Sequence, residues 1–118
     1  MPGATIKVSN PSRDTVLATR AETARTWCAR GCGLLGRSGL PAGGGLIIHP
    51  CNSVHTLGMA FAIDVLHLNR RLEVLRVSTM PPWRIGPLVL GSSYVLEIPA
   101  GAAAGTIPGD RLKFIPQP

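Results

Sequence analysis

Short hydrophobic runs, separated at close intervals by turn-forming residues, dominate the pattern along this chain. Runs of this length, rich in Val, Ile and Leu and bounded by Gly, Pro, Asn or Ser, are typical of β-strands. They predict seven strands, at residues 5–8, 14–18, 46–49, 62–68, 72–78, 93–98 and 111–115. Turn residues 69–71 separate two of these runs, which predicts that 62–68 and 72–78 pair as a hairpin.

One stretch has a helical pattern instead. Residues 19–22 have the spacing of a capping box, and small or apolar residues then recur near helical intervals, which predicts a helix from about Arg20 to Arg30. With 14 Gly and 11 Pro in 118 residues, the remainder favours strands joined by short turns. We therefore expect a mainly β fold: a small single-domain β-sandwich or barrel over residues 1–118, with one helix packed on it.

The chain is basic, with 12 Lys and Arg against 6 Asp and Glu, which gives a net charge of +6 at pH 7. A basic balance is the electrostatic footprint of a nucleic-acid-binding protein, so that function is one alternative. The arginines, however, are scattered in the sequence, with no run longer than two. Aromatic residues make up only 4%, which leaves no visible stacking platform for bases. The pattern thus argues against nucleic acid as a partner.

Cysteine usage and the apolar segments indicate the compartment. The three cysteines, Cys28, Cys32 and Cys51, lack the spacing of a disulfide framework, which fits a reducing environment. Residues 1–13 contain no apolar segment of the signal-peptide kind. Prolines and glycines interrupt the uncharged stretch 38–63, so it does not predict a membrane span. We therefore expect a cytoplasmic protein.

The densest polar stretch is His49-Pro50-Cys51-Asn52-Ser53-Val54-His55-Thr56. In an extended chain, alternate side chains would share one face: His49, Cys51, Ser53 and His55. With Asp64 downstream, these groups could hold a metal ion, or the thiolate could act as a nucleophile. Alternatively, these polar side chains accept hydrogen bonds from backbone amides of an irregular connecting segment, and Met59 fills a gap in the core. Because Cys-x-x-x-His is not a diagnostic metal spacing, we assign no metal, cofactor or catalytic residue.

Two acidic residues and one loop add candidates for a pocket. Asp64 and Glu97 lie among aliphatic residues in predicted strands, where carboxylates usually face solvent or pair with arginine. Arg76 and Arg84 are the candidate partners. Trp83 precedes Arg84 in a proline-rich loop and is either a binding anchor or a plug at one end of the fold.

These motifs follow one another in a recognisable order: Gly43-Gly44-Gly45-Leu46, Ser53-Val54-His55-Thr56, Ile63-Asp64-Val65 and Pro99-Ala100-Gly101. Over roughly residues 5–116 the chain resembles the domain-of-unknown-function 192 family, also called uncharacterised protein family 0127. The resemblance implies a compact, mostly β fold, and many members carry an N-terminal signal or lipoprotein leader. It implies no activity, substrate or cofactor. Two residues depart from the family pattern: Ala62 replaces the usual proline before Ile-Asp, and Asn69 an acidic turn residue.

The resemblance maps a set of family-like residues onto this chain: Cys51, Ser53, His55, Thr56, Met59, Asp64, Trp83, Arg84 and Glu97. Our leading hypothesis is a non-enzymatic binding module that holds a small ligand or a protein where these residues meet. Arg84 would contact an acidic or polar group, with Trp83 and Met59 supplying apolar contact. One alternative is a metal-dependent hydrolase or thiol enzyme that uses Cys51, His55 and Asp64. The other is the basic nucleic-acid binder.

Overall fold

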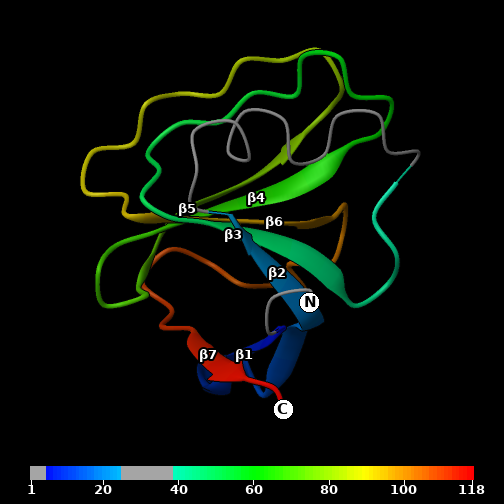
Figure 1. Cartoon of the computed structure of the whole chain (residues 1–118). Helices are drawn as coiled ribbons and strands as arrows, with labels where there is room; N and C mark the ends of the chain where they lie inside the picture. Colours follow the sequence, from blue (N-terminus) through cyan, green and yellow to red (C-terminus); the bar gives the residue numbers. More distant parts are fainter. Residues whose placement is uncertain (1–4, 25–38) are drawn as a thin grey trace.

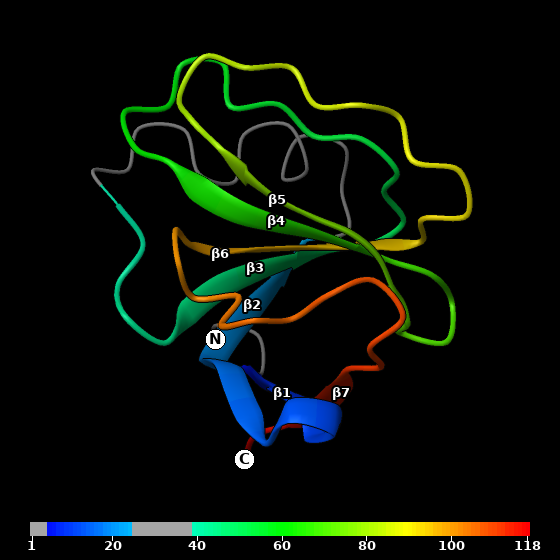
Figure 2. The same cartoon turned by 180° about the vertical axis from the view of Figure 1, so that it is seen from behind.

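The computed structural model describes residues 5–24 and 39–118, which form seven strands and one short 3-10 helix (Figures 1 and 2). In chain order the elements are β1 (Ile6–Asn10), η1 (Pro11–Arg13), β2 (Thr15–Ala24), β3 (Gly44–Ile48), β4 (Ile63–Leu68), β5 (Val74–Met80), β6 (Tyr94–Pro99) and β7 (Lys113–Pro116). The mainly β prediction is confirmed, and each predicted strand overlaps an observed one. The described part of the chain contains no helix long and apolar enough to cross a membrane.

All seven strands belong to one sheet, in the order β5-β4-β6-β3-β2-β1-β7. Neighbouring strands are antiparallel except β2 and β3, which run parallel, and β4 and β5 form the predicted hairpin. The sheet curls until the segments before β5 and β7 meet (Figure 2). There the Val74 N–H donates to the Asp110 carbonyl at 2.8 Å, and the Leu112 N–H donates to the Leu72 carbonyl at 2.9 Å. The architecture is therefore a half-barrel.

Strand β2 corrects the helix prediction. The residues expected to begin a helix at Arg20 instead continue β2 and pair with β3, while 25–30 lie outside the described residues. Two residues of the helical pattern, Ala21 and Ala24, are described, and both are buried in β2, as is Ala18, the last residue of the predicted strand. Ala18 and Ala21 share a core because of a bulge, where β1 advances two residues and β2 three, whereas Ala24 packs in the opposite core. The three alanines therefore never form one helical stripe.

Hydrophobic side chains pack on both faces of the central strands β3, β4 and β6, since alternate residues of a strand point to opposite faces. The lower core, on the side of β1 and β7 in Figure 1, includes Val8, Ile47, Leu66, Leu96 and Ile98. The upper core includes Leu46, Ile48, Ile63, Val65 and Val95. Two long loops, 49–62 and 81–93, lie over the upper core, and both carry residues of the predicted site.

Candidate functional site

Backbone hydrogen bonds join loops 49–62 and 81–93, which we call the loop pair. The Thr56 N–H donates to the Arg84 carbonyl at 2.7 Å, and the Trp83 N–H donates to the Thr56 carbonyl at 2.9 Å. Further along, the Gly86 N–H donates to the Val54 carbonyl at 2.9 Å. Prolines prevent regular strand pairing here, so these bonds take its place and hold the irregular backbone in one conformation.

Thr56 is the centre of this connection. Its side chain is fully buried; the hydroxyl donates to the Pro81 carbonyl at 2.6 Å and accepts the Arg84 N–H at 2.9 Å. Met59 is also buried and packs in the upper core. Both residues therefore support the loop pair from inside, and neither side chain is presented to solvent.

Asp64 has a similar supporting role on the other face of the sheet. Its carboxylate is 3% exposed and accepts the Thr79 hydroxyl at 2.6 Å and the N–H groups of Gly101 and Ala103 at 2.9 and 3.1 Å. Because Ala103 belongs to the lower core, Asp64 lies on the side of the sheet away from the loop pair. The enzyme hypothesis requires Asp64 to orient His55 through a hydrogen bond. The Asp64 carboxylate bonds to Thr79, Gly101 and Ala103 instead.

The polar stretch 49–56 also separates into different environments. Half-buried Cys51 donates its thiol hydrogen to the Ser53 carbonyl at 3.2 Å, and Ser53 itself is exposed. The His49 ring stacks on the Tyr94 ring with centroids 4.1 Å apart, whereas exposed His55 accepts the N–H of the residue two positions later. Among the described residues, no group of three or more His, Cys, Asp or Glu side chains is placed to hold a metal ion.

Glu97 is a candidate whose charge is strongly affected by its surroundings. It lies on β6 between Leu46 and Val65, so its 5%-exposed side chain is in the upper core. Burial raises the pKa of Glu97 to about 7, because an ionised carboxylate loses its hydration there. Neither arginine proposed as its partner forms an ion pair with it, since the ion pair found in the described residues is that of Arg13 with Asp110.

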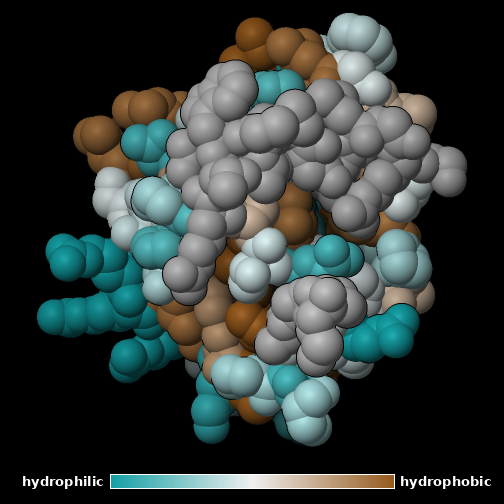
Figure 3. Space-filling view, viewed as in Figure 1, coloured by the Kyte–Doolittle hydropathy of each residue, from teal (hydrophilic) through white to brown (hydrophobic). Residues whose placement is uncertain are grey.

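Trp83 and its neighbours form the exposed part of the site. Trp83 is 65% exposed, so it is not a plug of the core. Other large apolar side chains on the loop pair are equally open to solvent, and with Trp83 they form what we call the apolar rim: Ile85, Leu88 and Leu90. Hydrophobic residues accordingly gather at the top and upper left of Figure 3, where loop 81–93 runs in Figure 1. Arg84 is also exposed on this loop.

The sequence motifs that form this half-barrel and its loops match those of a known family. The sequence model of DUF192, described as "Uncharacterized ACR", matches residues 8–114. The chain belongs to the DUF192 family. The family description assigns no activity, so the function has to be argued from the geometry.

Individual relatives agree with this family membership. A UPF0127 protein of Pyrococcus furiosus is 39% identical over 64 residues, which cover 52% of this chain and 55% of that protein. A UPF0127 protein of Pyrococcus horikoshii is 34% identical over 64 residues, covering 52% and 56%. This DUF192 chain thus spans about half the length of the curated relatives it matches. A crystal structure of a protein of unknown function from Novosphingobium aromaticivorans has a TM-score of 0.77 and 27% identity, covering 92% of this chain and 83% of that one.

Sequence reasoning found Trp83 but missed the rest of the apolar rim. A usable signal was present: Ile85, Leu88 and Leu90 lie in a segment whose prolines exclude a regular strand or helix. Apolar residues in such a segment have no periodic face to direct them into a core. Their exposure could therefore have been expected from the same prolines that predicted the irregular loop.

Proposed function

We propose that this DUF192 chain is a non-enzymatic binding module whose apolar rim holds an apolar segment of a partner protein. The observation that carries the proposal is the exposure of four large apolar side chains in one loop: 65% for Trp83, 77% for Ile85, 63% for Leu88 and 86% for Leu90. Exposed apolar surface is unfavourable in water, and several large apolar side chains exposed on one loop are typical of an interaction site.

Charge on the same loop specifies the chemistry of the partner. Arg84 is exposed beside Trp83, and its guanidinium donates a long hydrogen bond, 3.5 Å, to the Trp83 carbonyl. Arginine and tryptophan together are the residue types most often found at the energetic centre of interfaces. The partner segment should therefore carry an acidic side chain next to its apolar residues, so that the charge of Arg84 is matched.

Preorganisation supports binding by this loop. Its backbone is fixed by the hydrogen bonds to Val54 and Thr56, so little conformational entropy is lost when a partner docks. An enzymatic role has less support, because Asp64 lies on the opposite face of the sheet from the loop that carries Cys51 and His55. A catalytic dyad there would have to work without an orienting carboxylate from Asp64.

The test is a selection from a random 12-residue peptide library on immobilised protein, followed by affinity measurements on the selected peptides by fluorescence anisotropy. We expect sequences that combine large apolar residues with Asp or Glu. Trp83→Ala should weaken their binding about 30-fold, as for a central interface tryptophan. Val16→Ala, which truncates a 47%-exposed apolar residue on β2, is the matched control and should bind normally.

Two results would contradict the proposal. One is a selection that yields no saturable peptide, and the other is a set of peptides that Trp83→Ala binds as tightly as the wild type. Circular dichroism of each variant would establish that the fold is intact before binding is compared.

A further inference from the structure

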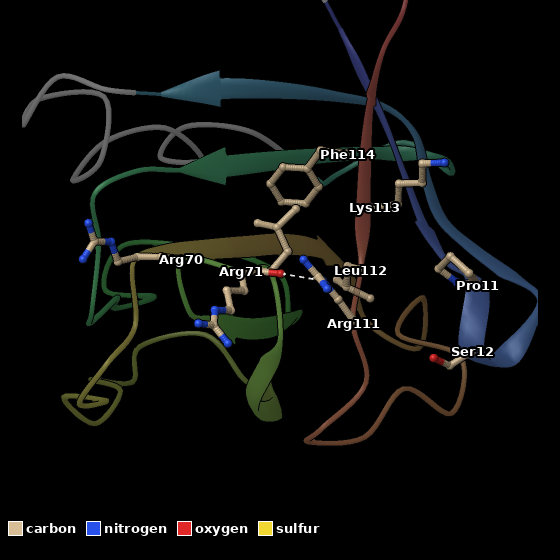
Figure 4. Close-up of a pocket in the computed structure, with 9 residues that line it drawn as sticks. Pro11, Ser12, Arg70, Arg71, Arg111, Leu112, Lys113 and Phe114 are labelled. Atoms are coloured by element: carbon tan, nitrogen blue, oxygen red, sulfur yellow. Dashed lines mark hydrogen bonds between the residues drawn. The ribbon is translucent and has the colours of Figure 1, made fainter.

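A second surface, independent of the proposed binding loop, lies at the closing edge of the half-barrel. A cleft of about 610 Å³ opens there between η1, the β4–β5 turn and the start of β7 (Figure 4). The cations Arg70 and Arg71 come from the turn, and Arg111 and Lys113 come from the segment that enters β7. Hydrophilic side chains project on the left of Figure 3, where this turn lies in Figure 1.

Four positive side chains therefore line one cleft, although they are about forty positions apart in the sequence. Among the described residues, no Asp or Glu side chain lines it. The adjoining acid, Glu73, accepts a hydrogen bond from the Asn69 side-chain amide at 2.8 Å. The ion pair of Arg13 with Asp110 involves none of the four cations. In Figure 4 the charged ends of Arg70 and Lys113 point away from each other, and all four cations are exposed, so an anion bound in the cleft would draw these side chains toward it.

The backbone around these cations is well fixed. The Asn69 side-chain carbonyl accepts the N–H groups of Arg71 and Glu73 at 2.9 and 3.0 Å, which shapes the turn. The Arg111 Nε–H donates to the Arg71 carbonyl at 3.1 Å, so this guanidinium joins the two sides of the cleft (Figure 4). In the described part of the chain its two terminal nitrogens make no hydrogen bond, so their donors are available to a ligand.

The chemistry of the lining indicates the ligand class. Guanidinium groups match phosphate oxygens with paired hydrogen bonds. Leu72 and Phe114 add an apolar wall, and the volume is in the range of small-molecule sites. A hollow of this kind suits a compact ligand better than a long polyanion, which needs a continuous basic track.

We propose that this cleft binds a nucleoside polyphosphate, with the phosphates on Arg70, Arg71, Arg111 and Lys113 and the apolar part of the ligand against Leu72 and Phe114. The site requires no function of the apolar rim. The fold brings Arg111 to the neighbouring pair Arg70 and Arg71, although about forty residues separate them in the sequence.

Isothermal titration calorimetry with ATP, inorganic triphosphate, adenosine and a 20-base-pair DNA duplex tests this site. We expect one ATP per chain, weaker binding of triphosphate and no measurable binding of adenosine. The double variant Arg70→Gln/Arg111→Gln should weaken ATP binding at least tenfold. Arg20→Gln/Arg76→Gln removes the same charge from exposed positions outside the cleft and should change binding less than about twofold.

Arg70→Gln/Lys113→Gln provides a second cleft variant that keeps the hydrogen bond of Arg111, so a folding defect cannot imitate the loss of binding. It too should weaken ATP binding about tenfold. The proposal is overturned if ATP shows no saturable binding, or if the cleft and control variants weaken it equally. Tighter binding of the duplex than of ATP would also overturn it, in favour of a nucleic-acid surface.

Discussion

The buried carboxyl of Glu97 should make the stability of this protein fall as the pH rises. Its pKa is raised from 4.5 to about 7 in the folded state, because burial disfavours the ionised form. Below pH 4.5 the carboxyl is protonated in both states and costs nothing. Between 4.5 and about 7 the unfolded chain releases the proton while the folded chain keeps it, so stability is lost over this window and is constant above it.

The difference between 4.5 and about 7 corresponds to a loss of about 3 kcal/mol in the free energy of unfolding. Glu97→Gln replaces the carboxyl by a neutral group of the same shape and removes this dependence. We expect the variant to be about 3 kcal/mol more stable relative to wild type at pH 8 than it is at pH 4.5. The titration of other groups, including His67, whose pKa is lowered by burial and then by Arg76, cancels in this comparison.

Urea unfolding followed by far-ultraviolet circular dichroism at pH 4.5 and pH 8 measures the effect. Glu22→Gln, which removes the same charge from an exposed position on β2, is the control for net charge. A difference between Glu97→Gln and wild type that is the same at both pH values would refute the reasoning. It would mean that Glu97 is solvated or compensated in the folded protein.

The remaining predictions concern the supporting residues and Trp83. Thr56→Val removes the hydroxyl that donates to the Pro81 carbonyl and accepts the Arg84 N–H, so urea unfolding should show a loss of about 1–3 kcal/mol, whereas Thr56→Ser should recover most of it. Asp64→Ala leaves the backbone N–H groups of Gly101 and Ala103 without their acceptor and should cost about 2 kcal/mol or more; a cost near zero would contradict the assigned bonds. Trp83→Ala should change stability by less than about 0.5 kcal/mol, and a protein that unfolds would show that Trp83 belongs to the core. The hydrogen bond from Arg13 is the main cause that lowers the pKa of Asp110 to about 2, so a carboxyl NMR titration of Arg13→Gln should show that pKa rising toward 3.8. The stability that this interaction gives is present above pH 3.8 and is lost as the pH falls through about 2, so the advantage of wild type over Arg13→Gln should shrink there.

The fold could be predicted where burial alone determines the strand. β4 and β6 lie inside the sheet with both faces covered, so their sequences are mainly apolar, although each contains one acid, and they stand out from the turns. β2 could not be predicted in full, because a bulge and a change of core place Ala18, Ala21 and Ala24 at a helical interval. A bulge depends on the partner strand, which the local sequence does not specify.

The same limit applies to the candidate site. Asp64 and Glu97 look alike in the sequence, since each is a single acid among aliphatic residues. The register pairs Glu97 with Val65, the neighbour of Asp64, so the two acids point to opposite faces. Alternation within one strand is readable from its sequence, but the alignment between two strands forms only when the sheet does.

The polar residues of the family motif are best explained by the demands of irregular backbone. Segments 81–86 and 100–105 lack a regular ladder, so their backbone N–H groups need other acceptors. Thr56 supplies one to the first segment and Asp64 supplies two to the second, which is a sufficient physical reason for these residue types at those positions. Within residues 5–24 and 39–118 no hydrogen bond to the Glu97 carboxyl is found, and its burial costs stability at neutral pH. A buried acid with that cost is where a role beyond folding should be sought, and Glu97→Gln, which we expect to fold and to be more stable than wild type at pH 8, is the variant in which loss of such a role could be detected.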